Sequence, residues 1–103
     1  MAELVEEQIF IIKNKLGLHA RAANLVVQLA SNFESIITVD KDGIEANAKS
    51  IMGLLLLAAG QGSRIIVKAE GRDCKEAVEK IGALIEGKFG EKEDALHRRR
   101  KNP

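Results

Sequence analysis

The sequence has few aromatic residues, a single cysteine and almost no net charge. Aromatic side chains make up only 3% of its 103 residues, and tryptophan and tyrosine are absent, so we expect an aliphatic core. Cys74 has no second cysteine with which to form an internal disulfide, which fits a reducing compartment. The formal net charge of +1 gives no overall field that would attract nucleic acid or an anionic membrane.

Long hydrophobic segments are also missing. The longest apolar run, residues 54–59, is far shorter than the about 20 residues that a membrane-spanning helix needs. Residues 1–8 are polar and acidic and lack the basic and apolar regions of a secretion signal. We therefore expect a cytoplasmic protein without membrane insertion. The length and the 46% hydrophobic content predict one domain with one core.

Hydrophobic periodicity predicts alternating strands and helices. Segments rich in β-branched residues predict four strands, at residues 5–12, 36–39, 44–46 and 64–69. Apolar residues spaced three and four apart predict a helix over residues 20–33. A short helix over residues 51–57 and a last helix after Asp73 complete the set, and Asp42-Gly43 is typical of a hairpin turn.

Two polar residues are expected to begin the later helices. Ser50 is a predicted N-cap, and Asp73 with Glu76 resembles a capping box. The element order is β-α-β-β-α-β-α, and three apolar helix faces can be buried on one face of a four-stranded sheet. We therefore predict a two-layer α+β sandwich over residues 1–90. Residues 91–103 are charged without an apolar stripe, and we expect a flexible tail that folding and function do not need.

A histidine and an arginine stand where the first loop becomes a helix. In Gly17-Leu-His19-Ala-Arg21, the glycine permits a tight bend and the helix start offers unpaired N–H groups to an anion. A neutral histidine ring is nucleophilic near pH 7. A phosphoryl group on His19 could thus be stabilised by N–H groups and by Arg21. Alternatively, His19 is only a polar residue near a helix start.

A metal site has little support in the sequence. His97 is the only other histidine and lies in the charged tail, and no pair of ligands has zinc-type spacing. We expect neither a metal nor a cofactor.

Two separated motifs resemble the HPr family, the histidine-containing phosphocarriers of the sugar phosphotransferase system. Residues 17–23, Gly-Leu-His-Ala-Arg-Ala-Ala, are similar to its active-site signature, and residues 47–53, Asn-Ala-Lys-Ser-Ile-Met-Gly, to the signature around its regulatory serine. The spacing between the motifs matches without a gap, and the likeness runs from Val5 to Phe89. One difference is Ala22, where the family usually has proline. Because alanine favours helices, we expect the helix to form with a looser start.

The resemblance implies a fold, a chemistry and partners. The implied fold is an open-faced sandwich with an antiparallel sheet of strand order 1-4-2-3, covered by three helices. The implied chemistry is phosphorylation of His19 at Nδ1, with Arg21 stabilising the phosphate. Enzyme I, charged by phosphoenolpyruvate, would be the donor, and IIA units of sugar transporters the acceptors. Such a protein is a carrier with a transient phosphohistidine rather than an enzyme with its own turnover.

The resemblance also implies a regulatory and a docking role around the second helix. Ser50 would be the target of a serine kinase and phosphorylase, besides being a helix cap. Ala20, Ile51 and Met52 would dock partners, and methionine suits several partners because its side chain adapts. The alternative for Ile51, Met52 and also Leu56, which follow Ser50 at helical spacing, is burial in the core. Because sequential docking needs an uncovered active face, we expect a monomer.

The sequence is also compatible with other functions. One is a carrier of the nitrogen-related phosphotransferase branch, with the same chemistry and other partners. Another is a regulatory binding module controlled through Ser50. A third is nucleic-acid binding, and only the basic run at residues 98–101 supports it. This run has no aromatic neighbour for stacking on bases, and we expect it to be a solvated tail.

Overall fold

Apolar residues at every second position place one face of the sheet against the helices. The structure, a computed structural model, describes residues 4–91. In β4 (Arg64–Glu70), Ile65, Val67 and Ala69 are buried, and the residues between them are more exposed. β2 (Ile36–Lys41) buries Ile37 and Val39 in the same way. This period of two is what a strand with one covered face requires.

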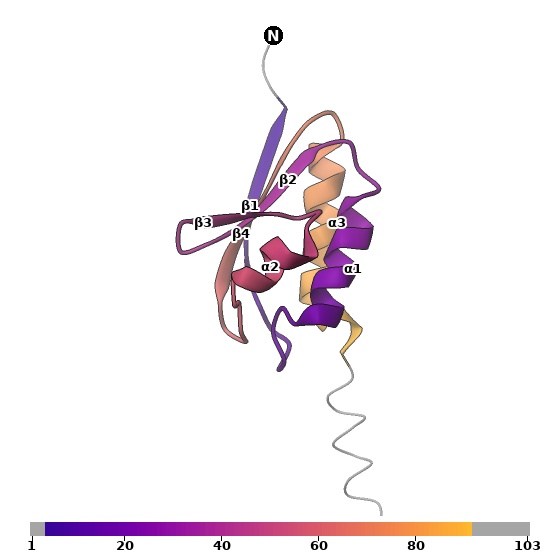
Figure 1. The fold of residues 1–103 in the computed structure, drawn as a ribbon. Helices are drawn as coiled ribbons and strands as arrows, with labels where there is room; N and C mark the ends of the chain where they lie inside the picture. Colours follow the sequence, from indigo (N-terminus) through magenta and orange to yellow (C-terminus); the bar gives the residue numbers. More distant parts are fainter. Residues whose placement is uncertain (1–3, 92–103) are drawn as a thin grey trace, which may run out of the picture.

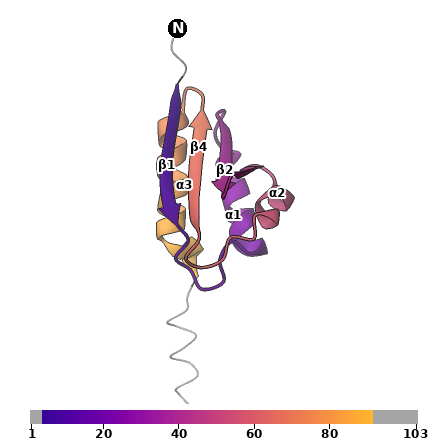
Figure 2. The ribbon, with the colours of Figure 1, turned by 90° about the vertical axis from the view of Figure 1, so that its left-hand side faces the viewer.

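The sheet has the predicted strand order. β1 (Val5–Ile11) pairs with β4, β4 pairs with β2, and β2 pairs with β3 (Ile44–Asn47), all antiparallel. The order β1-β4-β2-β3 confirms the expected 1-4-2-3 topology. The opposite face of the sheet carries no helix in Figure 2, which gives the open-faced form.

Three helices cover the other face of the sheet, as predicted (Figures 1 and 2). α3 (Cys74–Glu86) contacts β1 and β4, and α1 (Ala20–Ala30) lies against α3. α2 (Ile51–Leu56) contacts α1 and β3. Within residues 4–91, none of these helices has the length and apolar character needed to cross a membrane.

The core is not purely aliphatic, which corrects one expectation. Phe10 and Phe89 are both buried, at 5% and 1% exposure. Phe10 reaches α3 at Gly82, where an added Cβ would lie only 2.4 Å from the ring. Phe89 follows α3 in a short 3₁₀ turn, η1 (Lys88–Gly90), which the sequence pattern did not predict. With only three phenylalanines in the chain, composition alone did not reveal that two of them are core residues.

The first helix ends earlier than predicted. α1 stops at Ala30 instead of residue 33, because Asn32 N and Phe33 N bond to the carbonyls three residues before them, at 3.1 Å each. This tightening of the last turn is typical of helix ends.

The predicted capping box at Asp73 is wrong. Asp73 stands at the N-cap of α3, but its side chain makes no capping hydrogen bond. Its carboxylate instead accepts bonds from Glu34 N at 2.9 Å, from Ser35 N at 3.0 Å and from the Ser35 hydroxyl. The carboxylate therefore joins the start of α3 to the segment before β2.

Candidate functional site

His19 occupies the N-cap position of α1. Its backbone is extended, with φ −82° and ψ −177°, and its carbonyl accepts the first helical bond from Ala23 N at 2.8 Å. The ring makes no capping hydrogen bond, and 27% of the side chain is exposed. The ring is therefore held at the helix start and is partly accessible from solvent.

A glycine turn brings the chain to this position. Gly17 has φ +70°, and a Cβ there would lie 2.6 Å from Ala59 O and 2.7 Å from Gly60 Cα. Leu18 N then donates to Ala59 O at 2.8 Å. Only glycine combines this backbone conformation with such close contact. The loop before α1 is thus packed against the loop after α2.

The start of α1 offers the expected groups for an anion. The N–H groups of Ala20, Arg21 and Ala22 precede the first intrahelical bond, and the helix dipole adds partial positive charge at this end. The helix begins at Ala20 although residue 22 is alanine and not the proline that is usual in the HPr family. Ala22 is fully buried, so its methyl group takes part in the core.

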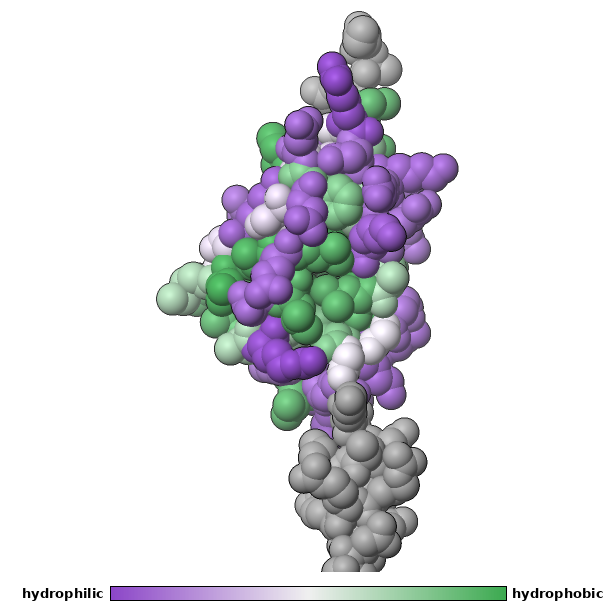
Figure 3. Space-filling model, turned by 90° about the vertical axis from the view of Figure 1, so that its right-hand side faces the viewer, coloured by the Kyte–Doolittle hydropathy of each residue, from purple (hydrophilic) through white to green (hydrophobic). Residues whose placement is uncertain are grey.

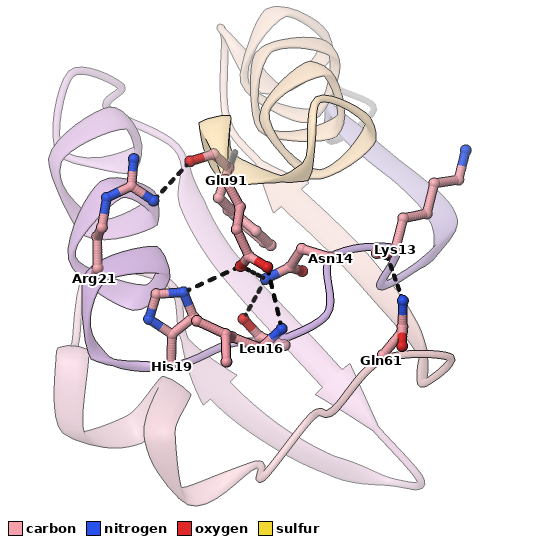
Figure 4. A network of polar contacts seen from close by, with 9 residues as sticks. Lys13, Asn14, Leu16, His19, Arg21, Gln61 and Glu91 are labelled. Carbon is pink, nitrogen blue, oxygen red and sulfur yellow. Dashed lines mark hydrogen bonds and ion pairs between the residues drawn. The ribbon is translucent and has the colours of Figure 1, made fainter. Parts of the chain in front are cut away.

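Arg21 does not point at His19 in this structure. Figure 4 shows the Arg21 guanidinium turned away from the His19 ring. Its Nη1 donates to the Phe89 carbonyl at 3.0 Å. The guanidinium group therefore contacts the η1 turn beside the site, and it would have to swing over to reach a phosphoryl group on the ring.

Two residues that the sequence analysis did not single out complete the site (Figure 4). Glu91 Oε1 lies 3.6 Å from His19 Nε2, and Asn14 Nδ2 donates to the same oxygen at 2.9 Å. Asn14 is fully buried and also donates to Gly17 O at 2.8 Å. Glu91 was expected in the flexible tail, yet its side chain is only 9% exposed. One signal was available in the sequence. Phe89, two positions before Glu91, is apolar, which indicates that the part of the chain packed on the domain extends beyond α3.

The predicted docking residues lie at the starts of α1 and α2, two helices that contact each other. Ala20 and Ile51 are exposed, and Met52 is 68% exposed, so these side chains of α1 and α2 are not core residues. Leu56, at the end of α2, is also exposed, so core burial is wrong for it as well. Leu16, which was not predicted to dock partners, is an exposed apolar side chain before α1. Figure 3 shows a hydrophobic area on the helical side of the molecule, bordered by hydrophilic residues.

Ser50 caps α2 as predicted. Its hydroxyl oxygen accepts a hydrogen bond from Gly53 N at 3.0 Å, and its backbone is extended. The residue is half-buried, so a modification at Oγ would alter the surface at the start of α2.

The other candidate features give less support for a functional site. Within residues 4–91, no group of three or more His, Cys, Asp or Glu side chains is arranged to hold a metal ion. Cys74 is a buried free thiol in α3. The basic run at residues 98–101 and His97 lie outside the described residues.

Comparison with known proteins gives consistent matches over most of the chain. The family model described as "PTS HPr component phosphorylation site" matches residues 6–87. The chain is similar to phosphocarrier protein HPr of Cupriavidus necator, at 49% identity over 80% of this chain and 92% of the relative. HPr-like protein Crh of Halalkalibacterium halodurans is 52% identical over 81% and 98% of the two chains. Phosphocarrier protein NPr of Shewanella violacea is 44% identical over 84% and 94%.

Solved structures agree with these matches. HPr-C-His from Thermoanaerobacter tengcongensis superposes with a TM-score of 0.81 at 52% identity, covering 84% of this chain and 98% of that chain. A structure described as an HPr dimer from the same organism gives a TM-score of 0.68 at 54% identity, covering 80% and 94%.

Proposed function

The chain belongs to the HPr family of phosphocarrier proteins of the phosphotransferase system, and from this premise we propose that it carries a phosphoryl group on His19 between two proteins. The observation that carries the proposal is the placement of a partly exposed imidazole at the N-cap of an eleven-residue helix. That position offers a nucleophile and unpaired N–H groups together.

We propose Nδ1 of His19 as the reacting atom. Nε2 is buried and faces Glu91, so the accessible part of the ring lies elsewhere. In the transfer, a bond forms from Nδ1 to phosphorus while the bond from phosphorus to the donor breaks. The reverse exchange with an acceptor regenerates the free ring, which makes the protein a carrier without turnover of its own and without a cofactor.

Arg21 is proposed to stabilise the phosphoryl group. Its present contact is a single hydrogen bond to a backbone carbonyl, which a charged phosphate oxygen can replace with a stronger, charge-assisted bond. Replacing Arg21 by alanine should slow transfer by about a hundredfold to a thousandfold, comparable to the loss of one donor from a site that stabilises a developing anion. Arg21→Lys should restore part of this loss.

Enzyme I is the proposed donor, and IIA components of sugar transporters are the proposed acceptors. The exposed apolar side chains of Met52, Ile51 and Ala20 would dock both, because one carrier surface must serve partners in turn. A serine kinase acting on Ser50 would regulate this surface. We place the protein in the cytoplasm and propose that it works as a monomer, which sedimentation velocity at working concentrations would test against the dimer described for a relative.

A carrier of the nitrogen-related branch is the second candidate, since one relative is called phosphocarrier protein NPr. A regulatory module controlled through Ser50 alone is the third, and a functional His19 would speak against it. Comparing phosphoryl transfer to acceptors of the two branches separates the first two candidates.

The experiment is phosphorylation of the purified protein by enzyme I and phosphoenolpyruvate. Wild type should gain acid-labile phosphate, and His19→Ala should gain none. His97→Ala is the matched control, because it removes the only other histidine and should leave transfer unchanged. Acid-labile phosphate on His19→Ala would reject the assignment.

A further inference from the structure

The buried nitrogen of the His19 ring faces a carboxylate. Among residues 4–91, only two buried side-chain polar atoms have no hydrogen-bond partner, and one of them is His19 Nε2. The other is Asn14 Oδ1, in the residue that binds Glu91 through its amide nitrogen. Glu91 Oε1 lies 3.6 Å from Nε2, slightly beyond hydrogen-bonding distance.

Glu91 is held in place by contacts that do not involve His19. Asn14 Nδ2 donates to Oε1 at 2.9 Å, and Leu16 N donates to Oε2 at 3.4 Å. Asn14 is itself fixed, because it is fully buried and donates to Gly17 O. The carboxylate is therefore a fixed feature of the site rather than a mobile surface charge.

The chemistry of the two groups selects one form of the ring. A neutral imidazole has one N–H and one nitrogen lone pair, whereas an ionised carboxylate only accepts hydrogen bonds. A lone pair on Nε2 would be repelled by Glu91. A proton on Nε2 would be attracted, and a shift of about half an ångström would bring Nε2 within hydrogen-bonding distance of Oε1.

We propose that Glu91 is a positioning residue that holds the neutral His19 ring in its Nε2–H tautomer, so that the lone pair for phosphoryl transfer lies on Nδ1. The inference rests on the proposed function and deepens it by naming the residue that sets the reacting nitrogen. When Nδ1 bonds to phosphorus and the donor bond breaks, Nε2 keeps its proton and the ring gains positive charge. Glu91 then stabilises this charge from the buried side.

The burial of Glu91 separates this role from docking. With 9% of its side chain exposed, Glu91 offers little surface to a partner protein. Its loss should therefore lower kcat for phosphoryl acceptance, by about tenfold for one charge-assisted hydrogen bond, and leave KM for the donor protein unchanged.

The first test reads the tautomer directly by NMR of ¹⁵N-labelled histidine rings, at a pH where the ring is neutral. A His97→Gln background leaves His19 as the single histidine. Wild type should show Nε2–H alone. Glu91→Ala should raise the Nδ1–H fraction, changing the tautomer ratio by about tenfold. Glu91→Gln should lie between them, because its amide oxygen still accepts a hydrogen bond. Glu79→Ala removes an exposed carboxylate from α3 and should match wild type.

The second test measures kcat and KM for transfer from phosphorylated enzyme I with the same variants. An unchanged tautomer ratio and kcat in Glu91→Ala, while wild type still accepts phosphate, would overturn the role of Glu91 and leave the proposed function intact. If wild type accepts no phosphate, the proposed function fails, and the NMR result still decides whether Glu91 sets the tautomer. Faster transfer by Glu91→Ala would also contradict the inference.

Discussion

The position of His19 depends on a single residue two places before it. Gly17 adopts φ +70°, and a Cβ added to it would collide with the backbone of Ala59 and Gly60. Gly17→Ala should lower the free energy of unfolding by about 1 kcal/mol from the backbone conformation alone, and further from the collision with these backbone atoms. Transfer should also slow, because the loop that presents His19 must shift. Urea denaturation and the phosphorylation rate measure the two effects.

Gly43→Ala is the matched control for this prediction. Gly43 has φ +86° in the hairpin turn, but an added Cβ would meet nothing within 4 Å. This variant should show only the conformational cost and normal transfer. Equal losses of stability in the two variants would show that the contact with Ala59 and Gly60 does not matter.

At the residue scale, local sequence predicted half of the site. His19 and Arg21 were recognised because a helix start next to a glycine turn is a local pattern. Asn14 and Glu91 were not, since they meet across 77 positions of the sequence and neither has a distinctive neighbour. The direction of Arg21, towards Phe89 O, depends on the same distant segment.

At the scale of elements, α2 carries the Ser50 cap at its start, next to the proposed docking residues Ile51 and Met52. Ser50→Ala should lose the bond to Gly53 N and lower stability by about 1 kcal/mol. Ser50→Asp keeps an acceptor at the cap, so its fold should survive, while the added charge beside Met52 should raise KM for enzyme I by about tenfold. Circular dichroism and transfer kinetics separate these effects.

The control places the same charge elsewhere. Ser31→Asp adds a carboxylate at the exposed C-cap of α1, the end of the helix opposite His19, and should leave KM unchanged. Equal transfer by Ser50→Asp and wild type would exclude a docking effect. Unfolding of Ser50→Asp would assign the effect to the fold instead.

The Asp73 carboxylate links α3 to the segment before β2 and should make stability depend on pH. The Ser35 hydroxyl, together with the N–H groups of Glu34 and Ser35, lowers the pKa of Asp73 below its ordinary value of 3.8. A lowered folded-state pKa gives stabilisation that is complete above the unfolded pKa and is lost as pH falls through the folded pKa. Asp73→Asn should therefore unfold at lower urea concentration than wild type at pH 7.

The difference in urea midpoint between Asp73→Asn and wild type should become smaller only below about pH 4, where the carboxyl group of the unfolded chain takes up its proton. Glu79→Gln, which removes an exposed carboxylate from α3, is the control and should track wild type throughout. A constant difference between Asp73→Asn and wild type from pH 7 to pH 2 would contradict the role of the charge.

Element types were predictable where apolar periodicity was regular, and their ends less so. β4 and the body of α1 follow simple spacing rules, so the sequence predicted both. The end of α1 depends on the bonds from Asn32 N to Leu29 O and from Phe33 N to Ala30 O. The start of α3 depends on the Asp73 carboxylate, which accepts a bond from Ser35 outside the helix instead of capping it. An aspartate can either cap its own helix or accept hydrogen bonds from a neighbouring segment, so residue type alone does not decide between these roles for Asp73.

At the scale of the whole molecule, the two-layer architecture could be predicted from the sequence pattern. The order of the strands in the sheet could be predicted only from the family resemblance. Three helix stripes and four strands indicate two layers. Local pattern does not contain the pairing of β1 with β4, in which Val5 lies opposite Glu70. The resemblance of the two motifs to the HPr family implied this strand order, and the structure confirms it.

The chain after Glu91 should be dispensable, whereas Glu91 itself should not be. A protein ending at Lys92 keeps the bonds from Asn14 and Leu16 to Glu91, so its melting temperature and transfer rate should match the full chain. Thermal unfolding and the phosphorylation assay measure both. A drop of several degrees, or slower transfer, would show that residues 93–103 stabilise the domain or its partners.

The most direct test of the carrier role follows one phosphoryl group through two transfers. Radiolabelled phosphoenolpyruvate and enzyme I are mixed with the protein, free phosphoenolpyruvate is removed, and a IIA component of a sugar transporter is added. The label should appear on this protein first and then move to IIA, with no labelling of either when His19→Ala replaces wild type. Label that never enters wild type, or that enters and cannot be passed to any IIA acceptor, would contradict the account.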